Sequence, residues 1–167
     1  DLNGNNLKNL TNTPNIIEAS PSFSVDGNKL IFTTKSDAVI PDLPDDEGQT
    51  ISYYDFELDT TLKILRHKND FTIGYTTQGV LFGKHYYHPH FGVNDDQVYF
   101  IKKSETAGDS LLYYNISTNE FQILVTDAWG MQRVHISNLR NQLLYNGSND
   151  LLISIDTDGS NRTILYD

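Results

Sequence analysis

The fold is decided by the stretch Pro21-Ser-Phe-Ser-Val-Asp-Gly-Asn-Lys-Leu-Ile-Phe32, because the chain repeats its pattern twice more. The second copy is Pro89-His-Phe-Gly-Val-Asn-Asp-Asp-Gln-Val-Tyr-Phe100, and the third is Val134-His-Ile-Ser-Asn-Leu-Arg-Asn-Gln-Leu-Leu-Tyr145. Each copy predicts a short strand, a tight turn and a second, apolar strand. Asp-Gly and Asn-Asp suit the first two turns, because these residues tolerate positive φ. The third turn has Leu139-Arg140 at this place and is the weakest match.

Two further strands are expected after each copy. They lie at residues 50–56 and 62–65, at 111–116 and 121–124, and at 151–155 and 162–165. The connecting segments consist of residues favoured in turns, and no segment has helical periodicity. Four short strands per repeat are typical of a β-propeller blade. We therefore predict an all-β chain of three four-stranded antiparallel blades.

The repeats also resemble a known family. The stretch Ser22-Phe-Ser-Val-Asp-Gly-Asn-Lys-Leu-Ile-Phe-Thr33 is similar to the "FSPDG-K-I-F-S" core of TolB-type (PD40, WD40-like) repeats, with Val25 where Pro is usual. The stretches Asp1-Leu-Asn-Gly-Asn-Asn-Leu-Lys-Asn-Leu-Thr11 and Asp156-Thr-Asp-Gly-Ser-Asn-Arg-Thr-Ile-Leu165 resemble the "D-DG-N-LT" segment that closes one blade and leads to the next. The family includes the Tol-Pal periplasmic protein, the propellers of prolyl-oligopeptidase-type enzymes and oligogalacturonate lyases. The resemblance thus implies a fold and leaves several functions open.

The blade count raises a question of closure. The predicted segments are the outer strand of a preceding blade at 1–13, a blade at 14–68, an inserted segment at 69–84, and blades at 85–127 and 128–167. Propellers typically have about four to eight blades, and an open array leaves unpaired strand edges. Three arrangements remain open: a segment of a six- to eight-bladed propeller, a homodimer closing a six-bladed ring, and closure within the chain through extra strands at 71–75 and 79–82.

Composition narrows the partners and the location. The chain has 167 residues and a formal net charge of −10, which argues against nucleic acid, because nucleic acid attracts clustered Lys and Arg. No run of about 18 apolar residues occurs, so no membrane insertion is expected. The sequence has no cysteine. The absence of cysteine, the acidity and the family resemblance predict a periplasmic or secreted location.

Three histidines mark the first candidate site. They lie in Lys84-His-Tyr-Tyr-His-Pro-His90, at the start of the innermost strand of the second blade. By the alignment, His90 is equivalent to His135 and to Ser22. Innermost strands line a propeller's channel, so His88, His90, His135 and Ser22 are expected to converge there, with His88 and His90 on one face of a regular strand. They could bind a divalent metal or an anionic substrate, or hold channel water as structural residues.

An acidic loop is the second candidate site. The stretch Ile40-Pro-Asp-Leu-Pro-Asp-Asp-Glu-Gly48 supplies carboxylates that suit Ca²⁺, although their spacing differs from that of an EF-hand loop. The carboxylates are Asp42, Asp45, Asp46 and Glu47. The alternative interpretation is an ordinary solvated loop.

The absence of nucleophile motifs favours binding over catalysis. The sequence has no Gly-x-Ser-x-Gly elbow and no phosphate-binding loop. We therefore predict a non-catalytic binding or scaffold module for a protein or peptide partner. Tyr86, Tyr87 and Trp129 are its candidate anchors, with packing between blades as the alternative role. The competing hypothesis is a metal-dependent carbohydrate-active lyase or hydrolase with His88, His90 and His135 as ligands.

Overall fold

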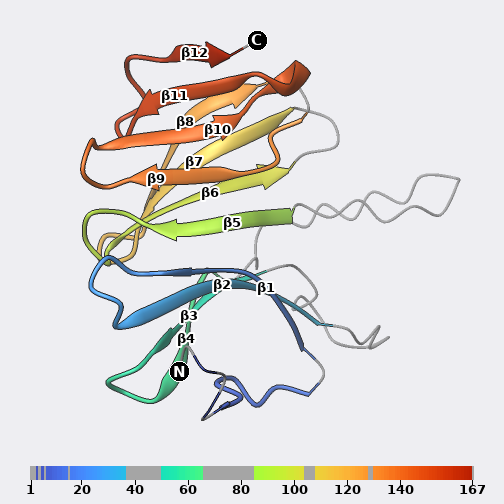
Figure 1. The fold of residues 1–167 in the computed structure, drawn as a ribbon, viewed down its shortest axis with the longest axis vertical. Helices are drawn as coiled ribbons and strands as arrows, with labels where there is room; N and C mark the ends of the chain where they lie inside the picture. Colours follow the sequence, from blue (N-terminus) through green and yellow to red (C-terminus); the bar gives the residue numbers. More distant parts are fainter. Residues whose placement is uncertain are drawn as a thin grey trace, which may run out of the picture.

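The computed structural model describes residues 3, 5, 7–14, 16–36, 50–65, 85–103, 108–127 and 130–166. These residues form three four-stranded antiparallel sheets in which consecutive strands pair (Figure 1). The first sheet contains β1 (Ile16–Phe23), β2 (Lys29–Ser36), β3 (Thr50–Asp55) and β4 (Thr60–Leu65). The second contains β5 (His85–Phe91), β6 (Gln97–Lys103), β7 (Asp109–Asn115) and β8 (Glu120–Asp127). The third contains β9 (Val134–Ser137), β10 (Gln142–Asn146), β11 (Leu152–Asp156) and β12 (Thr163–Tyr166).

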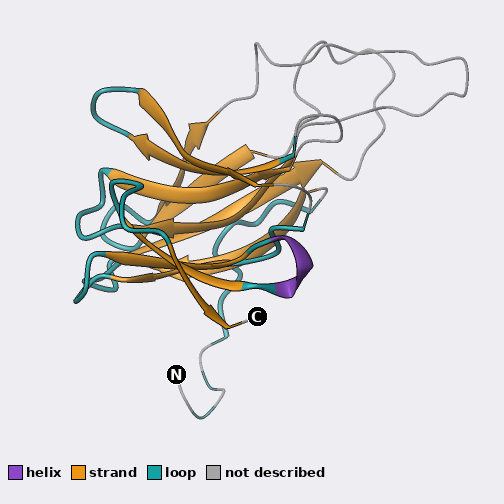
Figure 2. Cartoon of the chain, turned by 90° about the horizontal axis from the view of Figure 1, so that it is seen from above, coloured by secondary structure: helices purple, strands orange, loops and turns teal. Residues whose placement is uncertain are grey.

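The all-β prediction and the three four-stranded repeats are confirmed. A short 3-10 helix, Ser148–Asp150, precedes β11 and lies to one side of the strands (purple in Figure 2). Within the described ranges, no helix is long and apolar enough to cross a membrane.

The second sheet forms the middle of the stack and is buried on both faces (Figure 1). Along β6, Val98 and Phe100 belong to the apolar cluster shared with the first sheet. Tyr99 and Ile101 belong to the cluster shared with the third sheet. Successive side chains of a strand point to opposite faces, so a sheet packed on both sides needs an unbroken apolar run. The run from Val98 to Ile101 meets this need.

The hairpin turns explain both the strong and the weak matches between the repeats. In the first sheet, Gly27 has φ +77°, and the Asp26 carboxylate accepts hydrogen bonds from Asn28 N at 2.9 Å and Ser24 Oγ at 2.6 Å. In the third sheet, the left-handed residue is Asn141, with φ +51°. The turn there forms despite Leu139-Arg140, because the residue that tolerates positive φ comes directly after them.

The outer hairpins carry a second repeated feature. Asp59, Asn119 and Asn161 occupy corresponding turn positions with φ between +50° and +59°. In the first two sheets, a tyrosine hydroxyl binds this residue: Tyr54 donates to Asp59, and Tyr114 donates to Asn119 Oδ1 at 2.7 Å. The hydrogen bond from a tyrosine to the left-handed turn residue therefore recurs in the first two sheets, although their turn sequences differ.

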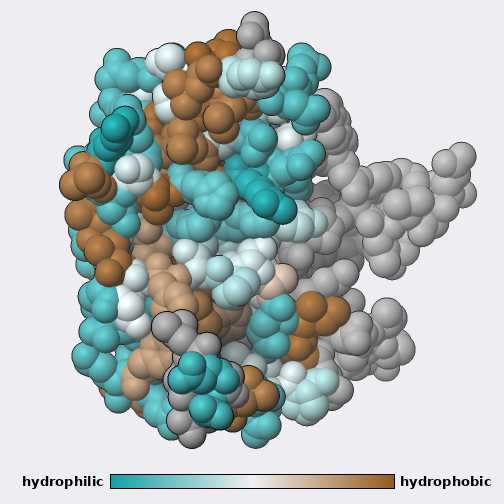
Figure 3. All heavy atoms as spheres, in the orientation of Figure 1, coloured by the Kyte–Doolittle hydropathy of each residue, from teal (hydrophilic) through white to brown (hydrophobic). Residues whose placement is uncertain are grey.

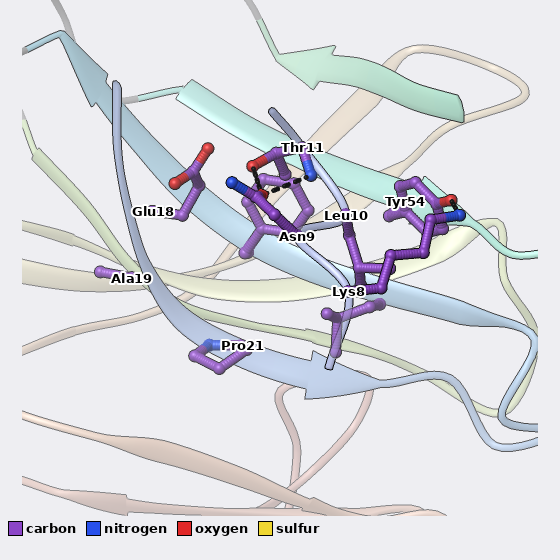
Figure 4. Close-up of a pocket in the computed structure, with 10 residues that line it drawn as sticks. Lys8, Asn9, Leu10, Thr11, Glu18, Ala19, Pro21 and Tyr54 are labelled. Carbon is purple, nitrogen blue, oxygen red and sulfur yellow. Dashed lines mark hydrogen bonds between the residues drawn. The ribbon is translucent and has the colours of Figure 1, made fainter. Parts of the chain in front are cut away.

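The outer strand of a preceding blade, predicted within residues 1–13, stays a prediction. Residues 7–10 pair with none of the described strands, all of which belong to the three sheets. They lie instead against the first sheet, where Lys8 Nζ is 2.6 Å from Asp59 Oδ1 and 3.4 Å from the Tyr54 hydroxyl (Figure 4). An open pocket of about 250 Å³ separates this segment from the sheet. The possible extra strands at 71–75 and 79–82 lie outside the described residues.

Candidate binding site on the innermost strands

The first strands of the three sheets, β1, β5 and β9, which are those predicted to be innermost, bring together Ser22, His90 and His135. Ser22 Oγ on β1 lies 2.8 Å from Nδ1 of His90 on β5, which is hydrogen-bond distance. The His90 ring centroid lies 5.7 Å from that of His135 on β9, and the two rings are tilted by 52°. The three residues hold equivalent positions in the aligned repeats. One position of the repeat thus forms a continuous line of polar side chains across three sheets.

Bulges in β1 and β5 position this line. The register shifts between Ala19 and Ser22 in β1 and between Tyr87 and His90 in β5. The first extra residue at each bulge has positive φ, +54° for Ser20 and +51° for His88. Each precedes a proline, which has no N–H to donate to a ladder and is tolerated at a bulge or on an edge strand. The third repeat has Val134 in place of proline, and β9 pairs without a bulge.

The bulge corrects one expectation about the histidines. Regular alternation would put His88 and His90 on one face of the strand, but this alternation is interrupted between Tyr87 and His90. His90 lies opposite Tyr99 of the second cluster and approaches the third sheet. His88 is nevertheless close enough to act on the charge of His90.

Burial makes His90 hard to protonate. Desolvation, followed by the nearby His135 and His88, lowers the pKa of His90 to about 4, although a hydrogen bond with the Val134 backbone acts in the opposite direction. Desolvation also lowers the pKa of His88, and Arg133, His135 and Lys103 add to the effect. Among the described residues, the charged side chains that act on these two imidazoles are Arg133 and Lys103, beside the neighbouring histidines.

Lys103 and Arg133 differ in whether a carboxylate already pairs with them. Lys103 Nζ lies 2.7 Å from Asp109 Oδ2, and the Asp109 side chain is only 3% exposed. The same oxygen accepts a hydrogen bond from the Gly130 backbone N at 3.0 Å, so Lys103 and Asp109 form a held pair. Arg133 is exposed, and no carboxylate among the described residues pairs with its guanidinium. His135 is exposed beside it.

The line of polar residues does not form a metal centre within the described ranges. No group of three His, Asp or Glu residues there is arranged to hold a metal ion. The Nδ1 atom of His90 already lies at hydrogen-bond distance from Ser22 Oγ. The metal ligation predicted for His88, His90 and His135 therefore has no supporting donor geometry in this part of the chain.

The contact between Ser22 and His90 also has the spacing of a nucleophile and its base. A base with a pKa of about 4 has little tendency to take a proton at neutral pH. Among the described residues, no carboxylate acts on His90 to orient it, as the third member of a triad does. His90 bonds to Ser22 and to the Val134 backbone, so the pair suits a structural contact between strands better than activation of a hydroxyl.

The remaining candidate residues fall into two groups. Tyr86 is 7% exposed and packs edge-to-face on Phe100 at 5.0 Å in the first cluster, so it offers no surface for a partner. Tyr87 is half-buried beside the second cluster. Trp129 and the acidic loop with Asp42, Asp45, Asp46 and Glu47 lie outside the described residues.

Sequence reasoning missed Arg133. A signal for it exists, because Arg133 lies two residues before His135 just as His88 lies two residues before His90. The repeated stretches start at Pro21, Pro89 and Val134, so Arg133 lies one residue before the third of them.

Solved structures support the fold. The chain is similar to a protein assigned as TolB from Agrobacterium tumefaciens, with a TM-score of 0.68 at 15% sequence identity, over 93% of this chain and 51% of that one. The fold is TolB-like. The chain spans about half the length of that protein.

Two other structures are similar only loosely. TolB from Acinetobacter baumannii has 16% identity and a TM-score of 0.46, over 95% of this chain and 45% of that one. An oligogalacturonate lyase in complex with manganese has 9% identity and a TM-score of 0.46, over 94% of this chain and 55% of that one. Likenesses at these TM-scores are too loose to bear on function. No protein-family model matches the sequence, and no curated protein matches it.

Proposed function

We propose that the chain is a non-catalytic binding or scaffold module that recognises a protein or peptide at the innermost strands of its sheets. The observation that carries the proposal is the line of Ser22, His90 and His135, one repeat position presented by three adjacent sheets. A rigid stack that offers polar side chains from several sheets at one face suits recognition of an extended segment. The polar groups fix the orientation of the ligand, while the packed sheets hold them in place.

We further propose that the three sheets are blades within a propeller of six to eight blades, with the blade limits given by the repeats. The TolB-like fold and the sequence resemblance support this, and so does the burial of the middle sheet on both faces. Two copies closing one ring, or closure through residues 69–84, are the other outcomes. The solution mass of the chain separates them. A periplasmic or secreted location belongs to the same proposal and has the same support.

The binding role is tested by affinity capture with matched variants. The wild-type chain, Arg133→Glu and Arg140→Glu are immobilised, exposed to an extract of the source organism, and the captured proteins are quantified by mass spectrometry. Arg140 is an exposed residue of the β9–β10 turn, so its substitution makes the same charge change outside the site. We expect a partner that the wild type and Arg140→Glu retain and Arg133→Glu loses. Equal capture by all three chains would contradict the proposed face.

A further inference from the structure

The charges at the innermost strands run against the composition of the chain. The sequence has 22 acidic and 12 basic residues, so a surface site drawn at random would have mostly acidic neighbours. Yet, among the described residues, the charged side chains that act on His88 and His90 are Arg133 and Lys103, beside the other histidines of the site. Asp109 binds Lys103 and the Gly130 amide, and so offsets the Lys103 charge. Arg133 supplies the remaining positive charge, and we call Arg133, His88, His90 and His135 the basic island.

In the part of the chain that the structure describes, no carboxylate pairs with the exposed side chains of this island. The Arg133 guanidinium carries five N–H donors in a planar fork that fits a carboxylate. His135, exposed beside it, presents an imidazole that can donate a further hydrogen bond. The His90 ring lies next to the His135 ring, and Ser22 in turn lies at hydrogen-bond distance from His90. In the space-filling view, hydrophilic residues gather over β9 and the adjoining part of β5 (Figure 3).

We propose that this island binds a carboxylate group of an acidic peptide segment, with Arg133 and His135 as the direct donors and His88 at its edge. The proposal rests on the proposed function, because it names the chemistry that the same face recognises.

The test follows the imidazole and guanidinium NMR signals of the full chain during titration. The probes are a blocked tri-glutamate peptide, its tri-glutamine counterpart and inorganic phosphate. We expect saturable shifts of the His135, His88 and Arg133 signals with tri-glutamate and none with tri-glutamine. Loss of one charge-assisted contact costs about 1.5 to 3 kcal/mol, so Arg133→Gln should weaken tri-glutamate binding about tenfold or more. Arg140→Gln, which removes the same charge outside the island, should bind as the wild type does.

Three outcomes would overturn the carboxylate assignment. They are equal shifts with tri-glutamate and tri-glutamine, equal affinity of the wild type and Arg133→Gln, and tighter binding of inorganic phosphate than of tri-glutamate. Urea unfolding of both variants shows whether each retains the fold of the wild type. Failure here is distinct from failure of the binding role. If tri-glutamate does not bind while partner capture still depends on Arg133, the proposed binding face is retained. Its ligand then belongs to a chemical class other than carboxylates.

Discussion

Ser22 Oγ and His90 Nδ1, 68 residues apart in the sequence, lie 2.8 Å apart and join the innermost strands of the first and second sheets. The contact forms because both residues follow a bulge that ends in a proline. It ties the candidate site to the stacking of the sheets. The stability of the stack and the shape of the site can therefore be probed through the same residues.

The first prediction concerns Ser22→Ala. The substitution leaves Nδ1 of the largely buried His90 without its partner, and an unpaired buried polar group costs about 1 to 3 kcal/mol. We expect the free energy of unfolding to fall by about 1 to 2 kcal/mol in urea titrations at pH 7. Ser110→Ala is the control, because the Ser110 hydroxyl pairs with Thr126 at an exposed position. A change of less than about 0.5 kcal/mol for both variants, as is usual at surface positions, would contradict the role of the contact.

The second prediction concerns acid. The folded-state pKa of His90, about 4, lies below its ordinary value of 6.5. Between these pH values the unfolded chain binds a proton that the folded chain excludes, so stability falls as the pH drops from 6.5 towards 4. For this group the loss is about 2 kcal/mol at pH 5 and reaches about 3 kcal/mol below pH 4. His88, whose pKa is also lowered, acts in the same direction.

The acid prediction is measured by urea unfolding of the wild type and His90→Gln at pH 5 and pH 7. His90→Gln removes the titrating ring, so its stability should depend less on pH over this interval than that of the wild type. Other titrating groups affect both proteins equally and cancel in the comparison. Identical pH dependence in the two proteins would show that His90 is freely protonated in the folded chain.

The third prediction compares a buried ion pair with an exposed one. Asp109, which is 3% exposed, binds Lys103 and the Gly130 amide, whereas Asp59, which is 69% exposed, binds Lys8. Removing one partner of a buried pair costs about 3 to 5 kcal/mol, and an exposed pair contributes at most about 1 kcal/mol. Since Lys103 is partly exposed, we expect Lys103→Ala to destabilise the chain by about 2 to 3 kcal/mol, because it leaves the buried Asp109 carboxylate without its cation. Lys8→Ala should have a smaller effect, because both partners of its pair are exposed. Thermal or urea unfolding checks the order, and a larger effect of Lys8→Ala would refute it.

The fourth prediction concerns the third hairpin. Asn141 holds φ +51°, a left-handed conformation that costs most non-glycine residues about 1 to 2 kcal/mol. Asn141→Ala should therefore lower the free energy of unfolding by about 1 kcal/mol, and Asn141→Gly should leave it nearly unchanged. If alanine and glycine have equal effects, the turn does not depend on this conformation.

Much of the fold could be predicted because each repeat contains turn residues and apolar runs that specify hairpins and strands locally. Asp26-Gly27 specifies a hairpin, and the apolar run from Val98 to Ile101 specifies a strand buried on both faces. The strand expected near residues 7–10 stays a prediction, because a strand needs a neighbour and none of the described strands belongs to the blade that it would complete. A sequence pattern shows the capacity to pair, and only the structure shows the partner.

The sequence predicted which residues of the candidate site come together, but it did not predict the bulge at His88 or the burial of Tyr86. The equivalence of Ser22, His90 and His135 could be found by alignment, because innermost strands of stacked sheets bring equal positions together. The bulge at His88 could not be placed from alternation, since it adds a residue to one strand and leaves the pattern of its partner unchanged. The burial of Tyr86 was also hidden, because an aromatic residue on an innermost strand has the same sequence signal whether it faces a partner or another sheet.

The most direct test of the account is hydrogen exchange of the chain with and without the partner recovered by affinity capture. The account predicts that the partner slows exchange in β1, β5 and β9, the strands that carry Ser22, His90 and His135, with the strongest effect around Arg133. Protection confined to the outer strands β4, β8 and β12 would contradict the central claim that the innermost strands form the binding face.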